Sequence, residues 1–251
     1  MSGRANSVNC EVCVIRHTGI CAALTAEELD QLSRIAQVRA FKPGQVIVQQ
    51  DEVPKFFANI VFGVVQLIET AEDGRRQIVG LLFPPDFLGR PFRSRSPYMA
   101  VAASELSLCC FPYPTFRRLL NTHTGLHRRL LEHTLDELDA ARKWMFLLGR
   151  KSAGERVASF LLLAARRATS FGCANNGLSN FARFSLPMTR SDIADCLGLT
   201  NETVSREITR LRRREVIEIR DNRNVVVPDL AALRLVAGDD SAPDSLSGMV
   251  N

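Results

Sequence analysis

The residues TRSDIADCLGLTNETVSREITRLRRR, numbers 189–214, have the pattern of two short helices joined by a tight turn. Thr189 and Asp192 stand three residues apart, which is the spacing of a capping box at the start of a helix. Gly198 allows the turn that two crossed helices need, and Thr200 can cap the second helix. The stretch therefore predicts a helix-turn-helix.

The second predicted helix has an apolar side and a polar side. Val204, Ile208 and Leu211 fall together at about 100° per residue. A solvated surface is the plainer interpretation of the other side. However, Glu can accept a hydrogen bond from cytosine and Arg can contact guanine with two hydrogen bonds. We therefore expect this side to read double-stranded DNA, through six candidate residues: Glu202, Thr203, Ser205, Arg206, Thr209 and Arg213.

Two neighbouring features favour the DNA interpretation. Seven arginines lie between residues 206 and 223, against four acidic residues, and such an excess of positive charge suits DNA phosphates. Residues 215–227, EVIEIRDNRNVVV, alternate around turn residues 221–224, which predicts a β-hairpin. A hairpin directly after a helix-turn-helix is a wing.

Composition sets the class of protein. The chain has 251 residues, 46% of them hydrophobic, and a net charge of +5, which is typical of a globular protein with a local basic surface. The N-terminal residues lack the apolar core of a signal peptide, and the longest apolar run is too short for a membrane span. We expect a cytoplasmic protein without a membrane partner. No catalytic motif stands out. The four histidines show no catalytic spacing: His17, His123, His127 and His133. We therefore expect that the protein is not an enzyme.

The remaining chain predicts an α+β protein. Residues 38–111 alternate with period two between turn residues, which indicates an antiparallel β-roll or small barrel. We expect five parts: a cysteine-rich segment at 1–22, a β-roll sensor domain at 23–114, a dimerisation helix at 115–150, a winged helix-turn-helix domain at 151–237 and a disordered tail at 238–251.

The tract at 115–148 has a helical pattern with a heptad repeat. Leu131, Leu138 and Met145 recur every seven residues, between strongly charged flanks. Such a narrow stripe suits a partner helix, whereas the alternative is a helix packed on its own domain. We expect a homodimer with these seam residues: Leu131, Thr134, Leu138, Ala141, Met145 and Leu148.

The cysteines are clustered. Three of seven lie in the first 21 residues, as C-x2-C-x7-C, and in the cytoplasm they are expected to be reduced. Such a cluster suggests a metal centre. An iron-sulfur cluster would need a fourth thiolate from the roll, where Cys109 and Cys110 alternate in direction. The alternatives are zinc, held by four cysteines or by three with His17, and a thiol sensor without a cofactor.

The order of roll, long helix and winged helix with E-x-x-S-R resembles the CRP/FNR superfamily of bacterial transcription regulators, over about residues 25–236. The N-terminal cysteines and the cysteine before Phe111-Pro112 look like its FNR branch, the oxygen sensors. The seven-residue spacing is longer than in the best-known FNR and resembles some alphaproteobacterial members. The resemblance implies a four-iron, four-sulfur (4Fe-4S) cluster on four ligands, with Cys109 preferred to Cys110: Cys10, Cys13, Cys21 and Cys109.

The resemblance also implies a mechanism. At low oxygen the cluster would favour pairing of the long helices, so that the dimer binds TTGAT-type palindromes and contacts RNA polymerase, with residues 73–76 as candidates. Oxygen would reverse this. Cyclic nucleotide is the rival ligand of the roll, but Gly89-Arg90 lacks the carboxylate expected for ribose, and Arg95-Ser96 is about one residue out of register.

Overall fold

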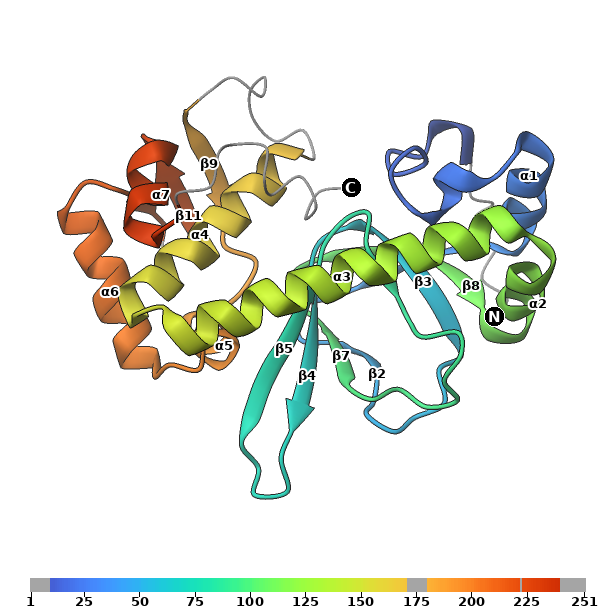
Figure 1. Ribbon diagram of the computed structural model, residues 1–251, viewed down its shortest axis with the longest axis horizontal. Coiled ribbons are helices and arrows are strands. Elements are labelled where there is room, and N and C mark those ends of the chain that lie inside the picture. Colours follow the sequence, from blue (N-terminus) through green and yellow to red (C-terminus); the bar gives the residue numbers. More distant parts are fainter. Residues whose placement is uncertain (1–9, 171–179, 222, 240–251) are drawn as a thin grey trace. The chain divides into compact units, whose positions relative to one another are not determined.

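A computed structural model describes residues 10–170, 180–221 and 223–239 (Figure 1). The chain divides into two compact units, Met1–Glu137 and Leu138–Asn251, and each is described by itself. Cys173 and the predicted tail from residue 240 onward lie outside the described residues.

Two antiparallel four-stranded sheets form the β-roll of the first unit. The first sheet has the order β1-β8-β3-β6, and the second has the order β2-β7-β4-β5. The strands of the first sheet are β1 (Gln37–Phe41), β3 (Phe56–Phe62), β6 (Phe87–Leu88) and β8 (Leu106–Pro112). Those of the second are β2 (Val46–Val48), β4 (Val65–Thr70), β5 (Arg76–Leu82) and β7 (Met99–Ala102).

Alternation along β3 and β8 creates two separate cores. Ala58 and Cys110 belong to the core that residues of both sheets share. Phe57 and Cys109 belong to a second core on the opposite face of the first sheet. Short helices cover this second core (Figure 1): the 3-10 helices η1 (Cys10–Val12) and η2 (Ile20–Ala23), then α1 (Ala26–Ile35) and α2 (Tyr113–Thr122).

The tract predicted as one helix from residue 115 is two helices. Helix α2 ends at Thr122, His123 is in an extended conformation, and α3 (Thr124–Arg150) begins at the next residue. The sequence has no proline at this break. Instead, the break lies where the chain contacts the N-terminal segment: His123 Nδ1 is 2.8 Å from Glu28 Oε1.

Among its described residues, the second unit contains the C-terminal part of α3, four complete helices and a small sheet. Helix α4 (Ala153–Ser170) packs against α6 (Asn201–Arg213), α7 (Leu230–Ala237) and β9 (Ala182–Ser185). Helix α5 (Arg190–Leu197) precedes α6, and β10 (Glu218–Arg220) and β11 (Asn224–Val227) follow it, in the sheet order β10-β11-β9. Two residues of the predicted disordered tail have defined contacts: Gly238 caps α7, and Asp239 pairs with Arg166 at 3.1 Å.

The predicted α+β architecture of roll, long helix and winged helix-turn-helix is thus confirmed. Within the described ranges, no helix has the length and apolar character to cross a membrane.

Candidate nucleic-acid interface and metal centre

Local capping fixes the helix-turn-helix. Thr189 Oγ1 accepts a hydrogen bond from Asp192 N, and Asp192 Oδ2 accepts one from Thr189 N, each at 3.1 Å. Gly198 ends α5 with φ 61° and ψ 42°, a left-handed conformation that favours glycine. Thr200 then caps α6, whose apolar side chains Val204, Ile208 and Leu211 are buried. The predicted capping box, turn and helix faces are all present.

The outer face of α6 carries the charged residues that the sequence predicts to contact DNA. Glu202 and Arg206, four residues apart, are exposed on one face, and Arg213 is exposed as well. Ser205, Thr203 and Thr209 are half-buried, and Thr209 Oγ1 donates a hydrogen bond to the Ser205 carbonyl at 2.8 Å. The three long charged side chains are therefore more exposed than the three short polar ones.

A polar cavity of about 200 Å³ lies beside α6, between the helix-turn-helix and the wing. Its polar lining residues are Arg190, Thr209, Arg212 and Asp221. Of these, Thr209 is a predicted DNA-binding residue, whereas the two arginines were not predicted. Two guanidinium groups near a hydroxyl suit a phosphate group. Arg190 comes from α5 and Arg212 from α6, which pack against each other, and the wing completes the lining with Ile219 and Asp221.

Helix α3 has two contrasting sides. Leu126, Leu130, His133 and Leu147 are buried against the chain itself. The opposite side has exposed large apolar residues: Leu131 (58%), Leu135 (52%), Leu138 (45%), Met145 (72%) and Phe146 (62%). Of the other predicted seam residues, Thr134 and Ala141 are exposed and Leu148 is half-buried. The exposed stripe is therefore available to a partner, and it also includes Leu135 and Phe146, which the heptad count omitted.

The four predicted cluster ligands lie around the outer face of the first sheet. Cys10 lies in η1, Cys13 follows it, and Cys21 lies in η2. Asn59 on β3 pairs directly with Cys109 on β8, and its Nδ2 donates a hydrogen bond to Cys21 Sγ at 3.5 Å. The buried amide of Asn59 thus connects the N-terminal segment to the strand that carries Cys109.

The thiols are also close enough to affect one another electrostatically. Burial raises the pKa of Cys21 to about 12, and the neighbouring Cys10 and Cys13 contribute to the same rise. Burial also raises the pKa of Cys109, and here Cys21, Cys10 and Cys13 again contribute. Cys110 lies in the other core, where burial raises its pKa to about 12 without a contribution from the N-terminal thiols. Cys109, and not Cys110, therefore shares its surroundings with the three N-terminal cysteines.

In the described part of the chain, no three His, Cys, Asp or Glu side chains are grouped closely enough to hold a single metal ion. The Oδ1 of Asn59, whose Nδ2 contacts Cys21, is buried and has no hydrogen-bond partner in the described residues.

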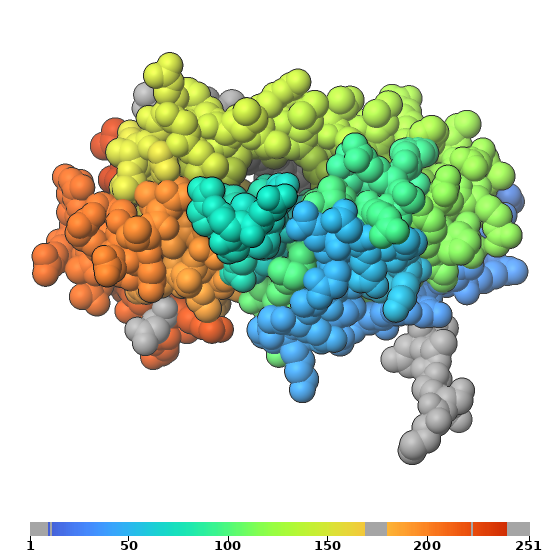
Figure 2. All heavy atoms as spheres, turned by 90° about the horizontal axis from the view of Figure 1, so that it is seen from below, coloured from blue at the N-terminus to red at the C-terminus, as the bar shows by residue number. Residues whose placement is uncertain are grey.

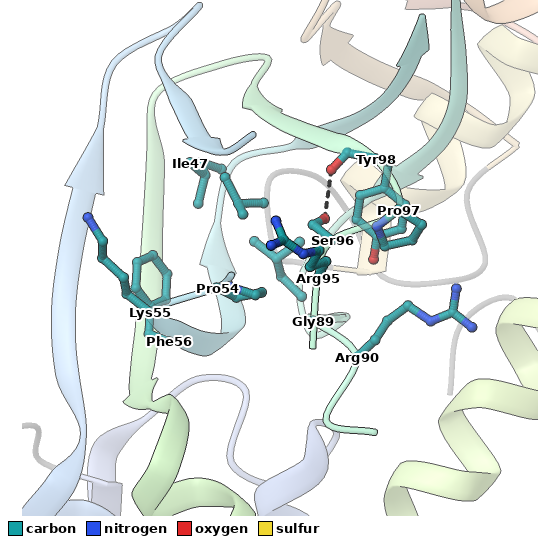
Figure 3. A pocket seen from close by; sticks show the side chains of 12 residues that line it. Ile47, Pro54, Lys55, Phe56, Gly89, Arg90, Arg95, Ser96, Pro97 and Tyr98 are labelled. Carbon is teal, nitrogen blue, oxygen red and sulfur yellow. Dashed lines mark hydrogen bonds between the residues drawn. The ribbon is translucent and has the colours of Figure 1, made fainter. Parts of the chain in front are cut away.

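The pocket of the roll that would hold a cyclic nucleotide is nearly filled. Its cavity is about 30 Å³, room for little more than water, between Gly89, Arg90, Arg95 and Tyr98 (Figure 3). Arg95 Nη1 donates a hydrogen bond to the Asp51 carbonyl at 2.6 Å. Ser96 Oγ donates one to the Tyr98 carbonyl, also at 2.6 Å. A nucleotide would have to open this loop and displace both interactions.

The β4–β5 hairpin projects from the roll, and its teal tip faces the viewer in Figure 2. Residues 71–75 of the tip are exposed. Asp73 Oδ2 accepts a hydrogen bond from Arg75 Nε at 2.7 Å, which holds the two charges together at the end of the hairpin.

A β-roll, a long helix with an exposed apolar stripe and a winged helix-turn-helix together define a DNA-binding transcription regulator. Comparisons with known proteins agree. Residues 155–236 match the family "Crp-like helix-turn-helix domain", and residues 38–123 match "Cyclic nucleotide-binding domain".

Among curated proteins, the chain is 46% identical to "Transcriptional activator protein FnrL" of Cereibacter sphaeroides, over 92% of this chain and 93% of that protein. It is 39% identical to the nitrogen fixation regulation protein FixK of Bradyrhizobium diazoefficiens, over 84% and 86%. The solved structure of FixK2 from Bradyrhizobium japonicum matches with a TM-score of 0.71 and 30% identity, over 83% of this chain and 99% of that chain. The chain belongs to the Crp/FNR family of transcription regulators, which confirms the predicted resemblance.

Proposed function

We propose that this regulator responds to oxygen through a 4Fe-4S cluster held by Cys10, Cys13, Cys21 and Cys109. The observation that carries the proposal is the contact of Asn59, the strand partner of Cys109, with Cys21 Sγ. It connects the two parts of the chain that would supply the ligands. The similarity to FnrL adds support from outside the structure.

The donor set suits the cluster chemically. When bound, such a cluster supplies a centre that oxygen attacks, so that its integrity reports the oxygen level. The chain's part is to present four thiolates, and each thiol must lose its proton first. Burial raises the pKa of both Cys21 and Cys109, so binding of the cluster would have to be accompanied by loss of these protons.

Control of DNA binding would follow from pairing of α3. The exposed stripe of α3 is the surface that a second copy would cover, and Ala141 offers a small neutral contact at its centre. Pairing positions two copies of α6 for successive major grooves, so the dimer would bind palindromes of the TTGAT type at low oxygen and control anaerobic or microaerobic genes. The β4–β5 tip is the candidate contact with RNA polymerase.

Iron and sulfide analysis of air-free protein tests the cluster. Cys109→Ala and Cys110→Ala are a matched pair, because both remove one buried thiol from the same strand. We expect about four iron and four sulfide per chain in the wild type and in Cys110→Ala, and little of either in Cys109→Ala. Zinc in the wild type, or equal loss in both variants, would contradict the proposal.

A further inference from the structure

The first turns of α3 are attached to the segment between the second and third cysteines. Arg129 Nη2 donates a hydrogen bond to the carbonyl of Thr18 at 2.9 Å. Thr18 lies between Cys13 and Cys21, so the contact joins α3 directly to the loop that these two cysteines would tie down. The Arg129 side chain is only 22% exposed.

Close packing supports this attachment. A Cβ atom at Gly125 would lie 2.9 Å from the Ala23 carbonyl oxygen, so only glycine allows the helix and the segment to approach this closely. Leu126 and Leu130 share a core with Ile20. The helix therefore has little freedom to move without the segment, and the segment has little freedom to move without the helix.

Arg129 depends on this one backbone acceptor. Its Nε is buried without a hydrogen-bond partner in the described residues, and its Nη1 is 3.5 Å from Glu132 Oε2. Without the Thr18 carbonyl, Arg129 Nη2 would lose its hydrogen-bond acceptor. Leaving a donor of a mostly buried, charged side chain unpaired is unfavourable in free energy. Glu132 also accepts a hydrogen bond from Arg128 Nε at 3.0 Å, and Arg128 is 83% exposed beside Leu131 of the apolar stripe.

We propose that Arg129 is a positioning residue that transmits the arrangement of the Cys13–Cys21 loop to α3. The proposal rests on the proposed function. While Cys13 and Cys21 are tied, the Thr18 carbonyl stays in place and Arg129 holds the start of α3 in the orientation that pairs. When the loop is released, Arg129 loses its acceptor and the helix is no longer held.

The test compares Arg129→Gln with Arg128→Gln, in the full-length chain loaded air-free with ferrous iron and sulfide. Both variants lose an interaction with Glu132, but only Arg129→Gln loses the contact with Thr18. Dimer dissociation constants are measured by sedimentation before and after air exposure, with iron content and visible absorption alongside. The response to air is the factor by which air exposure raises the dimer dissociation constant. We expect Arg129→Gln to keep its iron and absorption, and we expect this factor to be at least about ten-fold smaller than in the wild type. Arg128→Gln should respond as the wild type does.

Two further measurements make the outcome decisive. Arg129→Lys retains one donor and should recover part of the response to air. In the metal-free chain, Arg129→Gln should raise hydrogen exchange at residues 13–24 several-fold over Arg128→Gln, a result that does not depend on cluster loading. Equal exchange, or an unchanged air response in Arg129→Gln, would overturn the inference. A wild type without iron would instead overturn the proposed function and leave the exchange comparison to decide the role of Arg129.

Discussion

Leu138→Ala is expected to weaken the dimer by an amount that follows from its exposure. Leu138 retains 45% of its surface in a single chain. Complete burial of a leucine side chain stabilises by about 1.5–3 kcal/mol, so covering the exposed half contributes about 1 kcal/mol. A symmetric dimer contains the residue twice, and the substitution should therefore cost about 2 kcal/mol. This corresponds to a roughly 30-fold rise in the dimer dissociation constant.

Sedimentation equilibrium of air-free protein measures this effect, and Leu235→Ala is the matched control. Leu235 is on α7 and is 77% exposed. Leu235→Ala therefore removes the same side-chain atoms from an exposed leucine that does not belong to the stripe on α3. We expect no change in its dissociation constant. If Leu138→Ala dimerises as tightly as the wild type, or if Leu235→Ala weakens the dimer equally, then α3 does not pair through this stripe.

Three further predictions concern the seam, base readout and pH. Ala141→Asp places like charges across the seam and should weaken the dimer even when iron content is normal; unchanged sedimentation would count against the seam. Arg206→Ala should cost about 1–3 kcal/mol on the cognate site and relax preference at one base pair in a binding titration, whereas a uniform loss over all sequences would assign Arg206 to phosphate. Burial raises the pKa of Cys196 from about 9 to about 12, so the stability that its neutral thiol provides is present below pH 9 and is lost as pH rises towards 12. Relative to Cys196→Ala, urea unfolding should show about 2 kcal/mol less stability for the wild type at pH 10.5 than at pH 8.

The helix-turn-helix was predictable because its signals are local. The capping pair Thr189 and Asp192, the turn at Gly198 and the apolar side of α6 each depend on residues within one or two helical turns. Alternation also predicted that Cys109 and Cys110 point to opposite faces of their strand, and the structure places them in separate cores.

Features that depend on distant contacts were not predictable. The break between α2 and α3 coincides with contacts to the N-terminal segment, at His123 with Glu28 and at Gly125 with Ala23. The lining of the cavity at Arg190 and Arg212 is completed by Ile219 and Asp221 of the wing. The contact of Arg129 with Thr18 joins residues 111 positions apart, and periodicity gives no sign of it.

Operator binding before and after air exposure measures whether oxygen controls the occupancy of DNA by this regulator. One air-free preparation is titrated onto a TTGAT-type palindrome, exposed to air, and titrated again at the same salt concentration. We expect the air-free protein to occupy the palindrome as a dimer, and we expect air to remove iron, dimer and occupancy together. Equal occupancy before and after air would contradict control of DNA binding by a thiolate-bound cluster.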